Sequence, residues 1–146
     1  MNGQIQEPLS IVIRLDPKTK KNSMQPRLTR DKRFLGMMQS DAYQQYERDC
    51  LRVIPGKVRL HIKEPVNVKA LYFMKTRRKV DKTNLESALL DILVKAGVIE
   101  DDNCSIVVGT DGSRVRYDKN NPRTEVTIEP LEDEPYQVLM TMEEDW

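Results

Sequence analysis

Three aspartates bracket one amphipathic segment in the stretch VDKTNLESALLDILVKAGVIEDDN, residues 80–103. Asp81 precedes the segment, and Asp101 and Asp102 follow it. Carboxylates that converge repel one another unless a cation lies between them, and Mg²⁺ prefers such oxygen ligands. The basic runs KTKKN, residues 18–22, and KTRRK, residues 75–79, would attract a phosphate backbone. Together these residue types indicate metal-assisted hydrolysis of a phosphodiester.

Local explanations compete with this chemistry. Asp81 is a favoured residue for capping the N-terminus of a helix, although Thr83 with Glu86 forms an alternative capping box. Asp101 and Asp102 suit a solvated turn. A helix of about 13 residues is about 20 Å long, so aspartates at its two ends meet only if the chain doubles back along it.

The charge distribution favours a polyanionic partner. The chain of 146 residues has a net charge of +1, but its last 18 residues hold seven acids and no lysine or arginine, so residues 1–128 carry +8. A basic body of this kind is typical of nucleic-acid binding, with a solvated mixed surface as the alternative. We expect one domain at residues 1–130 and an acidic tail at residues 131–146, whose partner stays unknown. If the tail competes with DNA, deletion of residues 130–146 will tighten DNA binding.

Other classes of protein are disfavoured by the composition. The chain lacks a run of about 18 apolar residues, and its N-terminal residues lack the pattern of a signal peptide. Cys50 and Cys104 have no metal-type spacing, which indicates two reduced thiols. We therefore expect a cytoplasmic protein without a membrane segment.

Hydrophobic patterning predicts a small α+β domain, in which a mixed or mostly antiparallel sheet packs with two main helices. The expected helices cover residues 40–53, capped by Ser40, and residues 84–97, ending at Gly97. The second helix has a core-facing stripe, with Leu90 and Val94 on a second strip for another element or a second subunit. That stripe consists of Leu85, Ala88, Leu89, Ile92, Leu93 and Ala96.

The remaining elements are strands and one long loop. Residues 16–34 have no steady period and are expected to form a loop, which at this length is usually functional or disordered. A tight turn at Asp111–Gly112 predicts a hairpin of two short strands, residues 104–110 and 113–117. The other expected strands are residues 11–15, 58–62, 66–74 and 124–130.

The same stretch resembles the RusA family of Holliday-junction resolvases. The family pattern is an Asp-x-Asp-Asn-Leu sequence that opens a helix, then Asp and Leu, then Lys-Ala-Gly, then a pair of acids. It is matched here at Asp81, Asn84, Leu85, Asp91, Leu93, Lys95, Ala96, Gly97, Asp101 and Asp102. KKNS, residues 20–23, is similar to an Asn-rich segment of the family, and the resemblance covers most of residues 10–129.

The resemblance implies a homodimer that binds four-way junction DNA and cuts paired strands in recombination and repair. It implies Mg²⁺ as the cofactor, with Mn²⁺ as an alternative, and an origin in bacteria, a phage or a prophage. By the same resemblance, Asp81, Asp101 and Asp102 ligate the metal and orient or activate the attacking water.

Two positions depart from the family pattern. Thr83 replaces its second aspartate, and Ser87 replaces its lysine. Thr83 would then reach the metal only through its hydroxyl or a water, while Lys82 would supply the lost positive charge. Asn84 and Asp91 complete the set of supporting residues, although an ion pair with Lys95 is the simpler explanation for Asp91.

Two segments supply the expected DNA contacts. They are Lys20, Lys21, Asn22 and Ser23 in the early loop, and Arg77, Arg78, Lys79 and Lys82 before the second helix. Three hypotheses follow: a Mg²⁺-dependent junction endonuclease, a junction-binding or DNA-binding protein that has lost cleavage, and an interaction module that uses its acidic tail. The first predicts metal-dependent nicks that are lost in Asp81→Asn or Asp102→Asn.

Overall fold

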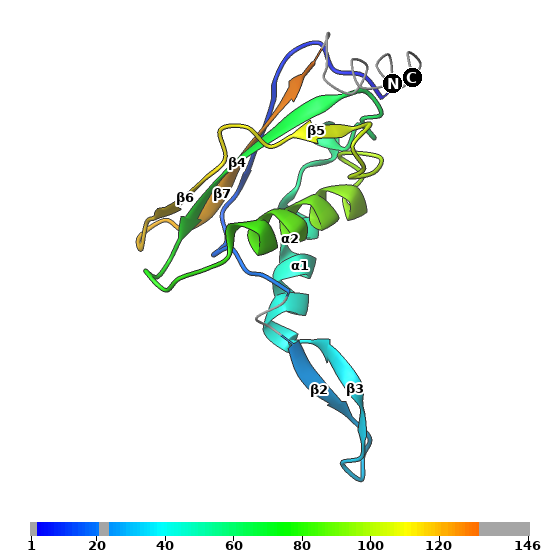
Figure 1. The fold of residues 1–146 in the computed structure, drawn as a ribbon, viewed down its shortest axis with the longest axis vertical. Coiled ribbons are helices and arrows are strands. Elements are labelled where there is room, and N and C mark those ends of the chain that lie inside the picture. Colours follow the sequence, from blue (N-terminus) through cyan, green and yellow to red (C-terminus); the bar gives the residue numbers. More distant parts are fainter. Residues whose placement is uncertain (1–2, 21–23, 132–146) are drawn as a thin grey trace, which may run out of the picture.

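A mixed five-stranded sheet forms the body of the protein in a computed structural model that describes residues 3–20 and 24–131. β1 (Leu9–Ile13) pairs antiparallel with β7 (Arg123–Pro130), which pairs antiparallel with β4 (Val66–Met74). β5 (Val107–Gly109) and β6 (Arg114–Tyr117) both run parallel to β4 (Figure 1). The predicted α+β class with a mixed sheet is confirmed. No helix in the described part of the chain is long and apolar enough to span a membrane.

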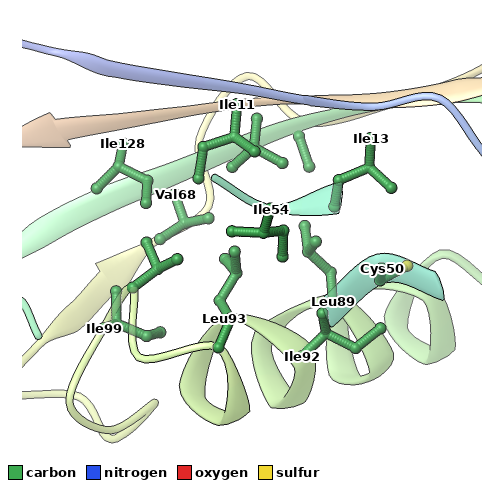
Figure 2. Packing of buried hydrophobic residues seen from close by; sticks show 14 of the residues in the cluster. Ile11, Ile13, Cys50, Ile54, Val68, Leu89, Ile92, Leu93, Ile99 and Ile128 are labelled. Carbon is green, nitrogen blue, oxygen red and sulfur yellow. The ribbon is translucent and has the colours of Figure 1, made fainter. Parts of the chain in front are cut away.

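Two helices lie on the same side of this sheet (Figure 1). α1 (Asp41–Val53) begins at the predicted cap, because the Ser40 hydroxyl accepts a hydrogen bond from the Tyr43 amide at 3.1 Å. α2 (Lys82–Lys95) buries the whole predicted stripe. Figure 2 shows Leu89, Ile92 and Leu93 of α2 in one cluster with apolar residues of the sheet, among them Ile11, Val68 and Ile128. The apolar core therefore fixes both ends of α2 against the sheet.

The predicted hairpin at residues 104–117 is wrong. β4, α2 and β5 form a crossover, so the chain returns to the start of β4 and runs parallel to it. The Asp-Gly turn does not reverse the chain, because the Asn67 side chain holds the Asp111 backbone: Asn67 Oδ1 accepts from its amide at 2.8 Å, and Asn67 Nδ2 donates to its carbonyl at 3.1 Å. β6 then continues along the same edge of β4.

The predicted loop at residues 16–34 is also wrong in part. β2 (Met24–Leu28) and β3 (Phe34–Gln39) form a separate antiparallel hairpin, which extends away from the sheet (Figure 1). Its turn closes where the Thr29 amide donates to the Arg33 carbonyl at 3.0 Å, with Lys32 at a φ of 63°. We call this hairpin the ribbon. The sequence analysis missed the ribbon because β3, FLGMMQ, does not alternate between polar and apolar residues, and β2, MQPRL, contains a proline, which argues against a strand.

A strand over residues 58–62 is not formed. Gly56–Val58 is a short 3₁₀ turn. Within residues 58–62, the one β-bridge joins Ile62 to Ile99. His61 has a φ of 50°, which breaks an extended conformation, and the His61 amide donates to the Gly97 carbonyl at 2.8 Å, so this stretch pairs with the chain that follows α2. Cys50 is buried and Cys104 is exposed, and both thiols are free as predicted.

Candidate active site

Asp81 caps the N-terminus of α2. Its Oδ1 accepts hydrogen bonds from the Thr83 amide at 2.9 Å and the Thr83 hydroxyl at 2.5 Å. The alternative capping box is wrong, because the Thr83 hydroxyl is turned towards Asp81 and Glu86 pairs with Lys82 at 2.6 Å. Asp81 is therefore an exposed carboxylate held in a fixed orientation at the end of the segment that follows β4.

Asp101 and Asp102 lie beyond the other end of α2. The helix ends at Gly97, whose φ of 76° suits a glycine, and the Val98 amide donates back to the Leu93 carbonyl at 2.9 Å. Asp101 Oδ1 accepts from the Asp102 amide at 2.8 Å, and Asp101 Oδ2 accepts from the Asn103 side chain at 3.0 Å. These hydrogen bonds, the Asp102 amide first, hold the pKa of Asp101 below its ordinary value. Both carboxylates are exposed.

Within one chain, Asp81 does not meet Asp101 and Asp102. The 14 residues of α2 separate them, a length of about 21 Å at 1.5 Å per residue. The chain after Gly97 does return antiparallel to the helix, as β5 and β6 beside β4, but Asp101 and Asp102 precede β5 and so remain beyond the C-terminal end of α2. Accordingly, no group of three histidine, cysteine or acidic residues able to hold a metal occurs within residues 3–20 and 24–131.

Asp91 serves as the centre of a charge cluster between the helices. It pairs with Lys20 at 2.7 Å and with Lys95 at 3.3 Å, and Lys95 also contacts Glu47 of α1 at 2.9 Å. Partial burial opposes ionisation of Asp91, but the hydrogen bonds and charges of the two lysines outweigh it and hold its pKa below the ordinary value. The predicted pair with Lys95 is confirmed, and Lys20, a predicted DNA contact, is engaged by α2.

The basic segment before α2 is exposed, as a DNA-binding surface requires. Arg77, Arg78 and Lys79 all lie in the exposed stretch between β4 and Asp81. Of the remaining predicted site residues, Asn84 is half-buried and Ser87 is exposed on α2. Lys21, Asn22 and Ser23 and the acidic tail after Leu131 lie outside the described residues.

β6 adds basic and aromatic residues that the sequence analysis missed. Parallel pairing places Tyr117 opposite Met74, and the Arg77 guanidinium lies 4.0 Å from the centre of the Tyr117 ring. Arg77 and Tyr117 line a shallow depression of about 390 Å³, and Arg78 and Arg116 line it too. The alternating arginines in the sequence SRVRY could have predicted a basic strand face. The position of this strand beside Arg77 depends on its pairing with β4, which the sequence does not show.

The fold and these surfaces define a class: a small α+β protein with exposed carboxylates beside a basic and aromatic surface suited to nucleic acid. Residues 5–129 match the model of the family described as Endodeoxyribonuclease RusA. The chain therefore belongs to the RusA endodeoxyribonuclease family, whose members resolve Holliday junctions. It is a hydrolase acting on phosphodiester bonds, and membership implies that it binds Holliday junction DNA. No curated protein matches the chain.

Proposed function

We propose that this endodeoxyribonuclease acts as a Mg²⁺-dependent homodimer that makes paired nicks in four-way junctions, with Asp81, Asp101 and Asp102 as its metal ligands. Nucleases of the RusA family are typically Mg²⁺-dependent. The observation that carries the proposal is the placement of these exposed carboxylates at the two ends of α2, with the basic segment next to one of them.

Two copies of α2 can bring the three aspartates together. In a two-fold dimer the same face of each copy meets its counterpart, and two copies of α2 run antiparallel where the axis is perpendicular to them. Asp81 of one subunit then lies near Asp101 and Asp102 of the other. The face suited to this contact runs along α2 at helical spacing from one end to the other. It consists of Thr83, Ser87, Leu90 and Val94, each exposed or half-buried.

The donors fit Mg²⁺ chemically, since all are carboxylate oxygens at a surface where the ion keeps several waters. The ion would neutralise charge on the scissile phosphate and activate water for attack. Arg77, Arg78 and Lys79 would bind flanking phosphates and fix the position of the strand. Asp81, oriented by Thr83, would present its carboxylate to the ion in a constant geometry. Two such sites in one dimer account for nicks in two strands.

The test is a mixing experiment on a labelled four-way junction with Mg²⁺, against EDTA and a linear duplex as controls. Asp81→Asn and Asp102→Asn homodimers should each be inactive. After subunit exchange, a heterodimer of the two variants retains one site with both aspartates intact, so single nicks should return. If each site lay within one chain, every site in the heterodimer would carry a substitution and nicks would stay absent. That result would refute the site across the dimer.

A second candidate function is junction binding without efficient cleavage. Thr83 and Ser87 favour it, because the family pattern has an aspartate and a lysine at these positions. It predicts tight, salt-sensitive junction binding that is unchanged by EDTA and yields no nicks. Restoring both residues with Thr83→Asp and Ser87→Lys should then raise cleavage, while junction binding changes little.

A further inference from the structure

The ribbon presents an apolar face that the described part of the chain leaves uncovered. Directly opposed residues of antiparallel strands point to the same face. Pro26 is opposite Met37, and Leu28 is opposite Phe34. Alternation along β2 puts both pairs on one side, because Pro26 and Leu28 are two residues apart. Leu28 is 51% exposed, Phe34 65% and Met37 55%. Single exposed apolar side chains are ordinary, but several together on one face mark a contact surface.

The ribbon also carries basic residues, one on the opposite face of β2 and the others in its turn. The ribbon, residues 24–39, contains Arg27, Arg30, Lys32 and Arg33, and its single acid, Asp31, is paired with Arg33 at 2.9 Å. All of these side chains are exposed. The ribbon thus has a net charge of +3, from four basic residues and one acidic residue. A complementary partner must be negatively charged and must also offer apolar surface.

A second ribbon does not meet these requirements. Two copies would bring equal positive charges together, which is unfavourable. Four apolar side chains also fall short of the roughly 800 Å² that each partner buries in a stable interface. Linear duplex DNA supplies phosphates, but its base faces are stacked. A branched junction supplies both phosphates and, at the branch point, base faces without a stacking neighbour.

We propose that the ribbon places Phe34 against the exposed base faces at the branch point of junction DNA, with Leu28 and Met37 beside it and its arginines on the phosphates. Proteins that distort DNA insert phenylalanine, leucine, methionine and proline as wedges between bases, and two-stranded ribbons enter DNA grooves. The inference rests on the proposed function and deepens it: the ribbon selects branched DNA, and the aspartates cut it.

The test uses the full chain in EDTA, where binding is read without cleavage. A junction carries the fluorescent base 2-aminopurine either at the branch point or inside one arm. Wild type should raise the fluorescence at the branch point and leave that in the arm unchanged. Phe34→Ala should remove most of this rise and weaken junction binding about tenfold, the lower part of the range for losing one aromatic–base stack, with duplex binding unchanged. Phe34→Trp should preserve both.

Val12→Ala is the matched control. Val12 is an apolar residue of β1, 45% exposed, and its substitution should alter neither readout. Unchanged branch-point fluorescence and affinity in the double variant Leu28→Ala, Phe34→Ala would overturn the inference. So would a change in sedimentation without a change in DNA binding, since that would assign the ribbon to a contact between subunits.

The two proposals fail differently. Absence of nicks with Mg²⁺ counts against the proposed active site and leaves the fluorescence in EDTA to decide the role of the ribbon. Wild type that binds a junction and a linear duplex equally well, without a rise at the branch point, refutes the ribbon proposal whether or not it nicks DNA.

Discussion

Asp81 has two roles that one pair of substitutions can separate. As the N-cap of α2 it accepts hydrogen bonds from the Thr83 amide and hydroxyl through a single oxygen, Oδ1. Asparagine retains that oxygen and is an equally good N-cap, so Asp81→Asn should keep the capping geometry. It removes the negative charge at the positive end of the helix, a loss of about 0.3–1 kcal/mol. Asp81→Ala removes the cap as well, a further loss of about 1 kcal/mol.

These magnitudes predict a clear order in thermal unfolding. A loss of 1 kcal/mol lowers Tm by about 2–4 °C in proteins slightly larger than this one. Asp81→Asn should therefore lie within about 4 °C of wild type, and Asp81→Ala should unfold several degrees lower. Junction cleavage should fall by about 10³-fold or more in both variants, since a metal ion contributes several kcal/mol to the transition state. Asp41→Asn, in the first turn of α1, is the matched control for lost helix charge and should retain cleavage.

Two results would refute this reasoning. Cleavage at the wild-type rate by Asp81→Asn would mean that Asp81 is a helix cap and not a metal ligand. A Tm as low for Asp81→Asn as for Asp81→Ala would mean that the hydrogen bonds to Thr83 do not stabilise α2. Calorimetry and a single-turnover nicking assay on the same preparations decide both points.

Three further predictions concern stability and reactivity. Asp91 pairs with Lys20, and its pKa is lowered in the folded state, so its contribution to stability should be present above the ordinary pKa near 3.9 and lost as pH falls through the folded value. The free energies of unfolding in urea of wild type and Asp91→Asn should differ by about 1 kcal/mol at pH 7 and converge as the pH falls below the folded-state pKa. Ile92 is fully buried, so Ile92→Ala should cost about 2–5 kcal/mol in urea unfolding, whereas a cost below 1 kcal/mol would contradict the packing of α2 on the sheet. Burial raises the pKa of the Cys50 thiol to about 11, so a thiol reagent at pH 8 should modify Cys104 rapidly in the native protein and Cys50 only after denaturation; equal rates would contradict the core.

Parts of the fold could be predicted from the sequence because they depend on interactions between residues close together in the chain. The apolar stripe of α2, the cap at Ser40 and the end at Gly97 depend on residues within one or two turns of each other, so periodicity and capping preferences located both helices closely. The carboxylate at Asp81 was correctly considered as a cap for the same reason. The RusA family pattern lies within the short segment from Asp81 to Asp102, and the match to the family model over residues 5–129 agrees with it.

Tertiary structure decided which of these residues meet. Whether the stretch after α2 forms a hairpin or returns parallel to β4 depends on hydrogen bonds from Asn67, more than 40 residues away along the chain. The same pairing places Tyr117 beside Arg77, and the length of α2 keeps Asp81 apart from Asp101 within one chain. A sequence pattern lists the chemical groups of a site, but strand pairing and helix length, which are set by contacts distant in sequence, determine where those groups lie.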